Sequence, residues 1–163
     1  MGGRLKSPAQ VLVVLALAGC DRSRPSSQPG APLAPTVQYI PRPPDGGPPR
    51  PFAAAVRVGD MLYLSGQIGT DSTGKVVSGG IEAETRQTLE NIKATLERNG
   101  SSLDNVVKCT AMLADMSEWP AMNTVYATYF TKHFPARSAF GTNGLALGAR
   151  MELECMATVD APR

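Results

Sequence analysis

The chain has 163 residues, a formal net charge of +2 and a hydrophobic content of 42%. This length is enough for one ordinary domain. From Pro51 onward the chain carries ten basic and twelve acidic residues and no basic stretch interleaved with aromatic residues, so we do not expect nucleic-acid binding.

Residues 1–19 have the features of a bacterial lipoprotein signal peptide. Two basic residues precede an apolar run, Ala9 to Ala18, that is too short to span a bilayer. Small residues then precede Cys20, the expected acceptor of a diacylglyceryl group. The alternatives are an ordinary secretory signal and a buried helix with a chance cysteine. Two or three acyl chains on Cys20 would anchor the protein stably. We expect an exported protein on the periplasmic side of a bacterial membrane, and Asp21 points to the inner membrane.

Residues 20–51 are predicted to form a tether. Ten of the 14 prolines lie between Pro25 and Pro51. Such a segment buries too little apolar surface to offset the entropy of ordering it, and its prolines favour extended geometry. The run from Val37 to Ile40 is the one part of it that is compatible with a strand. We therefore place the folded domain at residues 52–163.

Within this domain the pattern predicts the order β-β-α-β-α-β-β. Hairpin signals, short apolar runs and helical spacing of apolar residues identify the elements. The expected strands are 53–58, 61–68, 106–113, 137–142 and 151–159, and the expected helices are 81–99 and 120–130. This order predicts an α/β domain in which two helices cover one face of a single sheet. The other face also needs a cover, which in a small domain argues for an oligomer.

Five segments of the domain together resemble one known family. They are Leu64 to Ile68, Thr85 to Ile92, Met122 to Tyr126, Phe134 to Ser138 and Met151 to Glu154. In this order they resemble the reactive-intermediate deaminase family, also called Rid or YjgF. The resemblance implies a chorismate-mutase-like fold and a homotrimer with clefts between subunits. It also implies hydrolysis of small 2-imino acids to 2-oxo acids and ammonia, without a metal or a cofactor.

The resemblance also assigns roles to individual residues. Arg137 is the expected clamp for the substrate carboxylate, because a guanidinium can hold a carboxylate through two parallel hydrogen bonds. Glu152 is the expected catalytic carboxylate that orients water and accepts its proton. A structural salt bridge and an edge-strand charge are the respective alternatives. The residues expected to line the substrate cleft are Phe52, Ser65, Gly66, Asn123 and Arg137.

Two departures from the family pattern bear on activity. Many family deaminases have tyrosine where Phe52 stands, so a hydroxyl group is lost here. Many also have cysteine where Ala139 stands. The first departure leaves open a non-catalytic trimer that binds a small carboxylate, and hydrolysis of related C–N bonds such as those of carbamates is a third hypothesis.

The other two cysteines, Cys109 and Cys155, match no zinc-binding or redox spacing. They can pair only if their strands lie side by side. We expect two buried, reduced thiols.

Overall fold

The computed structural model of the chain describes residues 34–44 and 50–159. Both segments belong to one compact unit, Ala34–Arg163. The predicted signal peptide, the predicted lipid acceptor Cys20 and the first part of the predicted tether lie outside the described residues. In the part of the chain that is described, no helix combines the length and the apolar composition that a membrane crossing requires.

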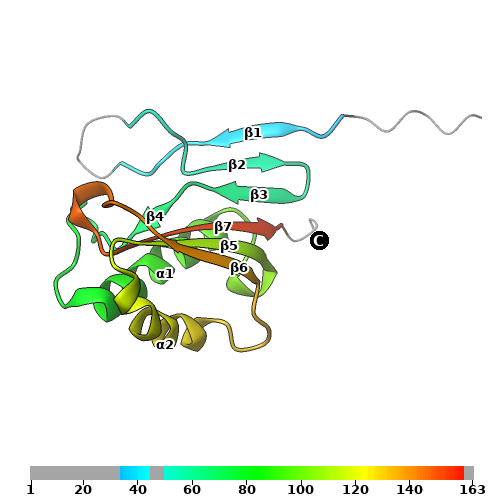
Figure 1. Ribbon diagram of the computed structural model, residues 1–163. Helices are drawn as coiled ribbons and strands as arrows, with labels where there is room; N and C mark the ends of the chain where they lie inside the picture. Colours follow the sequence, from blue (N-terminus) through cyan, green and yellow to red (C-terminus); the bar gives the residue numbers. More distant parts are fainter. Residues whose placement is uncertain (1–33, 45–49, 160–163) are drawn as a thin grey trace, which may run out of the picture. The chain divides into compact units, whose positions relative to one another are not determined.

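The unit is built on a seven-stranded sheet with the strand order β1-β2-β3-β7-β5-β6, in which β4 also pairs with β7 (Figure 1). Strands β5 and β6 are parallel, and the other paired strands are antiparallel. The strands are β1 (Val37–Ile40), β2 (Ala55–Val58), β3 (Met61–Leu64), β4 (Gln67–Ile68), β5 (Val106–Leu113), β6 (Ala136–Gly141) and β7 (Met151–Thr158). Strand β7 therefore lies inside the sheet, between the amino-terminal hairpin and β5.

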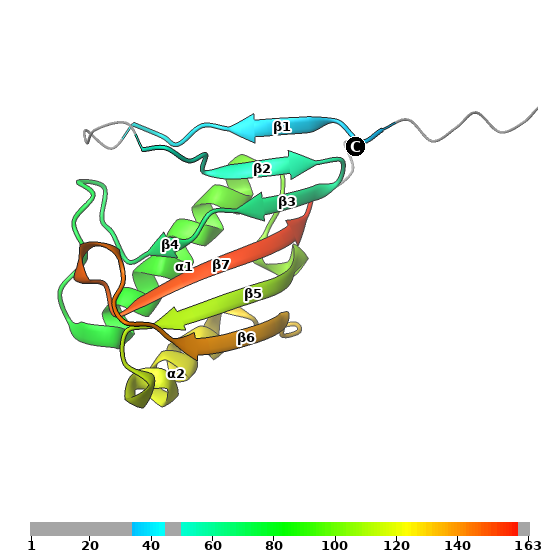
Figure 2. The same ribbon diagram turned by 45° about the horizontal axis from the view of Figure 1, so that its top comes forward.

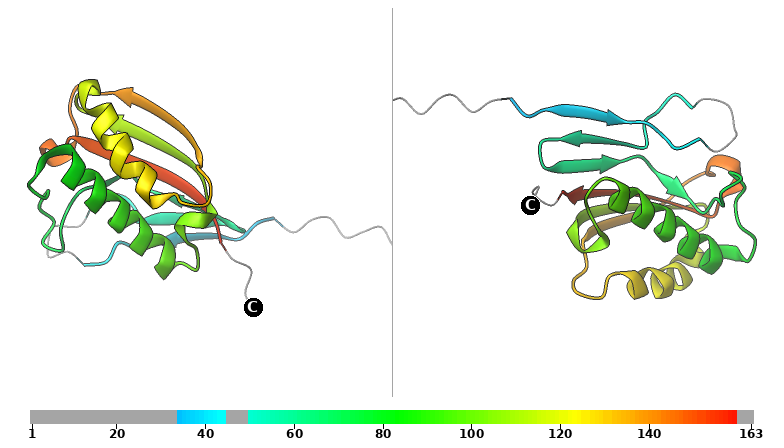
Figure 3. Two further views of the ribbon diagram at one scale, coloured as in Figure 1. Left: turned by 90° about the horizontal axis from the view of Figure 1, so that it is seen from below. Right: turned by 180° about the vertical axis from the view of Figure 1, so that it is seen from behind.

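Two helices lie side by side on one face of this sheet (Figures 2 and 3). They are α1 (Gly80–Arg98) and α2 (Trp119–Tyr129), accompanied by short 3-10 turns at Leu103–Asn105, Met116–Glu118 and Ala146–Gly148. Leu89, Ile92 and Leu96 recur at helical spacing along α1 and are fully buried in the core. Pro120 stands in the first turn of α2, where backbone N–H groups have no acceptor within the helix, so the N–H that proline lacks costs no hydrogen bond. The predicted α/β fold, with two helices on one face of one sheet, is confirmed.

Strand β1 corrects the predicted start of the domain. The composition predicted a tether over residues 20–51, but Val37–Ile40 form an edge strand that pairs antiparallel with β2. The backbone N–H of Ala54 also donates to the carbonyl oxygen of Ile40, at 2.8 Å. Backbone pairing therefore outweighs the proline-rich composition on either side, and the sheet begins well before residue 52.

The cysteines of β5 and β7 also overturn a prediction. Cys109 and Cys155 stand directly opposite each other in the antiparallel ladder, with a Cα–Cα distance of 4.1 Å, and form a disulfide. Both are buried, as expected, but they are not reduced thiols. Opposite positions in an antiparallel pair bring two Cβ atoms within bonding reach of a disulfide. Their sequence separation of 46 residues conceals this register.

The face of the sheet opposite the helices carries exposed apolar side chains. Leu62 and Leu64 are buried on the helix side, so Tyr63 between them points to the other face. The strand pairing places Tyr39 on that same face, and Tyr39 is 73% exposed. Phe140 at the other edge of the sheet is also exposed and shares this face. Exposed aromatic side chains on one face of a sheet suit a surface that another protein covers.

Candidate active site

Arg137 projects from the edge strand β6 toward helix α2. It lies beside Cys109 in the parallel β5–β6 pair, on the side of the sheet that the helices cover. Its Nη2 donates a hydrogen bond to Oδ1 of Asn123, at 2.5 Å, and its Cζ lies 4.3 Å from the centroid of the Tyr126 ring. The hydrogen bond and the cation–π contact together fix the orientation of the guanidinium.

Two buried polar atoms in this cluster lack a hydrogen-bond partner within residues 34–44 and 50–159. They are Nη1 of Arg137 and the hydroxyl oxygen of Tyr126. Burial raises the pKa of Tyr126 to about 12, while the nearby charge of Arg137 acts in the opposite direction. The phenol therefore keeps its proton at neutral pH. A buried donor without an acceptor is costly, so this cluster suits a ligand that brings acceptor oxygens.

Glu152 lies on β7 and packs directly against the backbone of Gly66. A Cβ atom on Gly66 would stand 1.8 Å from Oε1 of Glu152, so no larger residue fits there without moving the carboxylate. Burial, and secondarily the charge of Glu154, raise the pKa of Glu152. A carboxyl group with a raised pKa is suited to accept and return a proton.

Ser65, which precedes Gly66 in the chain, binds the backbone of the segment that follows Phe52. The Ser65 hydroxyl donates to the carbonyl oxygen of Ala53, at 2.8 Å, and the Ser65 N–H donates to that of Ala54, at 3.0 Å. These bonds hold the segment that carries Phe52, whose ring is 46% exposed. Ser65 therefore acts here as an anchor for the chain, and its hydroxyl proton is already engaged.

The predicted site residues thus form two groups. We call Arg137, Asn123 and Tyr126 the Arg137 half, and Glu152, Gly66, Ser65 and Phe52 the Glu152 half.

The two halves lie on opposite faces of the sheet within one protomer. Arg137 shares the helix-covered face with Cys109 and its disulfide partner Cys155. Glu152 stands three residues before Cys155 in the same strand, and side chains alternate along a strand, so Glu152 faces the other way. The structure therefore brings Arg137 to Asn123 and Glu152 to Gly66, but it does not bring Arg137 to Glu152.

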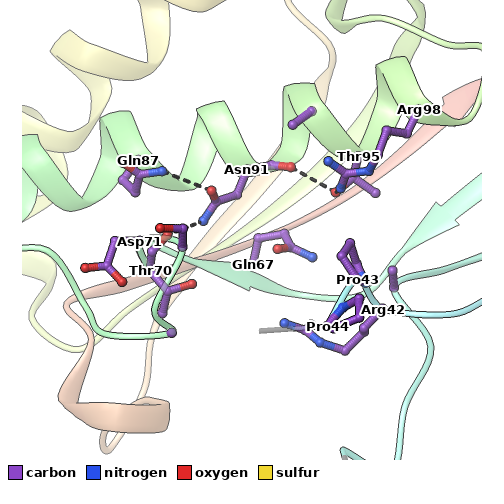
Figure 4. A pocket seen from close by; sticks show the side chains of 14 residues that line it. Arg42, Pro43, Pro44, Gln67, Thr70, Asp71, Gln87, Asn91, Thr95 and Arg98 are labelled. Atoms are coloured by element: carbon purple, nitrogen blue, oxygen red, sulfur yellow. Dashed lines mark hydrogen bonds between the residues drawn. The ribbon is translucent and has the colours of Figure 1, made fainter. Parts of the chain in front are cut away.

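Two contacts were not predicted. Tyr126 was predicted as part of an apolar helix stripe and of a segment that resembles the family, but not as a site residue, although its position three residues after Asn123 puts both on one helix face. Arg42, from the segment after β1, places its Cζ 5.3 Å from the centroid of the Phe52 ring. No group of three or more potential metal ligands occurs among the described residues. A cavity of about 410 Å³ lies elsewhere, and none of the predicted site residues lines it (Figure 4).

Comparison with known proteins finds one family. The family model described as endoribonuclease L-PSP matches residues 46–159. The 2-iminobutanoate/2-iminopropanoate deaminase of Homo sapiens is 43% identical over 108 residues, which cover 66% of this chain and 79% of that protein. A RutC family protein of Pyrococcus horikoshii is 44% identical over 108 residues, covering 66% of this chain and 86% of its own length.

Solved structures agree with these matches. Yeast Mmf1 superposes with a TM-score of 0.69 at 33% identity, covering 77% of this chain and 100% of its own. The YjgF protein of E. coli gives a TM-score of 0.66 at 31% identity, covering 74% of this chain and 98% of its own.

Proposed function

The chain belongs to the endoribonuclease L-PSP family, also known as the Rid or YjgF family, and on this premise we propose that it hydrolyses 2-imino acids to 2-oxo acids and ammonia. The observation that carries the proposal is the ordered guanidinium of Arg137, which keeps a buried nitrogen without a partner among the described residues. Relatives at 42–43% identity carry the name of a 2-iminobutanoate/2-iminopropanoate deaminase. The mildly acidic charge of the domain argues against an RNA substrate.

In the proposed reaction, Arg137 binds the substrate carboxylate and thereby places the C=N carbon. Glu152 accepts a proton from a water molecule as the water oxygen bonds to that carbon. Glu152 returns this proton to the nitrogen, and the hydroxyl proton of the resulting carbinolamine passes to the nitrogen as the C–N bond breaks, so ammonia leaves as the carbonyl forms. Both protons come from the attacking water and end on the nitrogen, so the balance requires no oxidant.

We infer that the complete site forms between protomers of a homotrimer. Support comes from the opposite orientations of Arg137 and Glu152 and from the apolar face that carries Tyr39 and Tyr63. In a closed ring each interface pairs one surface of a protomer with a different surface of its neighbour. The Arg137 half of one protomer would then meet the Glu152 half of the next.

Ammonia release from 2-iminopropanoate, generated in the assay, tests the chemistry. The full chain should exceed the spontaneous rate, and Arg137→Ala and Glu152→Gln should each remove the acceleration. Arg86→Gln is the matched control, because Arg86 is an exposed arginine on α1 outside both halves. A correctly assembled oligomer that binds 2-oxobutanoate without accelerating hydrolysis would instead support the carboxylate-binding alternative, which the missing hydroxyl at Phe52 favours.

Mixed oligomers test the shared site. Arg137→Ala and Glu152→Gln subunits, dissociated and reassembled together, should regain about a quarter of the wild-type activity, because that share of interfaces joins two intact halves. Each variant reassembled alone should stay inactive. No recovery in the mixture would place both residues in one protomer's site.

We also propose that the protein is exported and anchored by lipid at Cys20, on the periplasmic side. The disulfide between Cys109 and Cys155 supports an oxidising compartment, where such bonds persist. Mass spectrometry of the mature amino terminus should find a diacylglyceryl group on Cys20, and Cys20→Ala should release the protein from the membrane fraction. An unmodified amino terminus would contradict the anchor.

A further inference from the structure

Helix α1 packs against β4 and β7, and these two strands pair where Ile68 stands opposite Glu152 (Figure 2). Glu84, near the start of this helix, is a buried carboxylate with an exposed fraction of 5%. Burying a carboxylate is costly unless hydrogen bonds and a cation compensate its charge. The groups that compensate Glu84 are therefore tied firmly to α1.

Glu84 holds the start of β7. Its Oε2 accepts a hydrogen bond from the backbone N–H of Arg150, at 2.7 Å, and Arg150 stands two residues before Glu152. The carbonyl oxygen of Arg150 accepts in turn from the N–H of Ala114, at 2.9 Å. The backbone is therefore fixed on both sides, by α1 and by the end of β5, just before the strand that carries Glu152.

Glu84 also contacts the chain at the end of the other strand, β4. A Cβ atom on Gly69 would stand 2.6 Å from the backbone oxygen of Glu84 and 2.8 Å from its Cα, so α1 lies directly against the chain at this glycine. Gly69 follows Ile68, the residue of β4 that pairs with Glu152. One residue of α1 thus contacts the chain at the end of β4 and at the start of β7.

The side chain of Arg150 leads to the other half of the site. Its Nε lies 4.0 Å from Oε1 of Glu84, and its Nη1 forms an ion pair with Oε1 of Glu118. The second oxygen of Glu118, Oε2, is buried and lacks a hydrogen-bond partner among the described residues, so Arg150 supplies the compensating charge. Glu118 is the N-cap residue of α2. The guanidinium of Arg150 therefore ties the start of β7 to the start of the helix that carries Asn123.

We propose that Glu84 and Arg150 are positioning residues for the proposed reaction, which act on the two halves of the site by separate routes. Glu84 acts on the Glu152 half through the backbone N–H of Arg150. The guanidinium of Arg150 acts on the Arg137 half through Glu118. The routes can be separated, because replacing the side chain of Arg150 leaves its backbone N–H in place. This inference rests on the proposed deaminase function, whose two halves it connects.

Steady-state kinetics with 2-iminobutanoate separate the two routes. Glu84→Ala removes the acceptor of the Arg150 N–H, so kcat should fall about tenfold or more with little change in KM. Glu84→Gln keeps an acceptor oxygen and should restore most of kcat. Arg150→Met loses the ion pair with Glu118, so KM should rise about threefold or more while kcat changes little. The matched controls, Glu82→Ala and Arg86→Met, replace exposed residues of α1 outside these contacts and should change neither constant.

Two further measurements do not depend on imine hydrolysis. Burial raises the pKa of Glu152, and NMR titration of its carboxyl carbon measures this pKa. Glu84→Ala should move the pKa toward that of an exposed glutamate, because β7 holds the carboxylate less firmly against Gly66. Arg150→Met should leave this pKa unchanged and should weaken the binding of 2-oxobutanoate by the factor seen in KM.

These readouts distinguish the two proposals. A wild-type chain that does not accelerate imine hydrolysis would contradict the deaminase function, and the positioning roles would then be decided by the pKa and the 2-oxobutanoate affinity. A folded Glu84→Ala variant with unchanged kcat and an unchanged pKa of Glu152 would overturn the inference. So would the same kinetic pattern in Glu84→Ala and Arg150→Met, since one shared pattern would reduce both to a general loss of stability.

Discussion

The two halves of the proposed site are ordered in different ways. In the Arg137 half, side chains add contacts: Asn123 accepts a hydrogen bond and the ring of Tyr126 stacks on the guanidinium. In the Glu152 half, a missing side chain at Gly66 provides the room for the carboxylate. The first half should weaken gradually as single contacts are removed, whereas the second should fail when its space is filled. The first should act mainly on substrate binding and the second on the chemical step.

The largest expected effect falls on both halves at once. Cys109 pairs with Arg137 across the β5–β6 ladder, and its disulfide partner Cys155 lies in the same strand as Glu152. Replacing both cysteines by alanine should lower the free energy of unfolding by about 4 kcal/mol, because the crosslink restricts a separation of 46 residues in the unfolded chain. Denaturant unfolding under oxidising conditions measures the loss. Reduced wild-type protein, unfolded in the same way, loses the crosslink but keeps the sulfur atoms, so it separates the two contributions. An unchanged unfolding midpoint in both the reduced protein and the double variant would contradict a stabilising disulfide.

Filling the space at Gly66 should damage only the Glu152 half. Gly66→Ala should lower kcat about a hundredfold with little change in KM, since the new Cβ displaces the carboxylate of Glu152, which is proposed to act as the base. It should also lower the free energy of unfolding by about 1–3 kcal/mol, the usual cost of overpacking. In a Glu152→Ala background that stability cost should disappear, because the colliding side chain has gone. A cost that persists there would show that the backbone of Gly66, rather than the carboxylate beside it, is the constraint.

Removing one contact from the Arg137 half should give the opposite kinetic signature. Asn123→Ala leaves the guanidinium in place but takes away the side-chain oxygen that accepts from its Nη2, so KM should rise about tenfold while kcat changes little. Steady-state kinetics with 2-iminobutanoate measure both constants. Asn123→Asp, which keeps an acceptor oxygen, should restore part of the affinity only if the acceptor orients Arg137. A drop in kcat as large as that of Gly66→Ala would end the distinction between the halves.

Much of the fold could be predicted from the sequence because its signals are local. The apolar periodicity of Leu89, Ile92 and Leu96 specifies one buried helix face, and the Gly59-Asp60 junction specifies a hairpin. Strand β1 falls within the predicted tether because prolines flank it, and in the structure its side chains bury little apolar surface. Its pairing with β2 depends on backbone groups, which carry no sequence signature.

The site was predictable only in parts for a related reason. Resemblance pointed to Arg137, Glu152, Asn123 and Gly66, and local chemistry explains their immediate contacts. The face on which each side chain lies depends on strand register, which is a property of pairing across the sheet. The disulfide was missed for the same cause, since only the β5–β7 register places Cys109 opposite Cys155.

The smallest expected effect is a shift along the pH axis, and it concerns the Glu152 half alone. Burial, and then the charge of Glu154, raise the pKa of Glu152, so its ionised form should dominate only above the pH range in which a glutamate ordinarily ionises. Activity that needs the carboxylate as a base should therefore rise with pH through that raised pKa. Conformational stability should change in the opposite direction. The stabilising contribution of Glu152 is complete below the pKa that Glu152 has in the unfolded chain, and it is lost as the pH rises through the higher pKa that Glu152 has in the folded chain.

Glu154→Gln isolates the second cause. It removes the neighbouring negative charge while keeping the size of the side chain, so the acid limb of the kcat/KM profile should move to lower pH and its plateau should stay the same. Glu154 is not among the residues proposed to bind the substrate, and within one protomer Arg137 lies on the other face of the sheet, so the KM at the plateau should not change either. An acid limb that stays in place would mean that burial alone sets the pKa of Glu152. A limb that moves together with a lower KM would mean that, in the assembled site, Glu154 lies close enough to the bound carboxylate to repel it, and the Glu152 half would then contribute to substrate binding as well as to the chemical step.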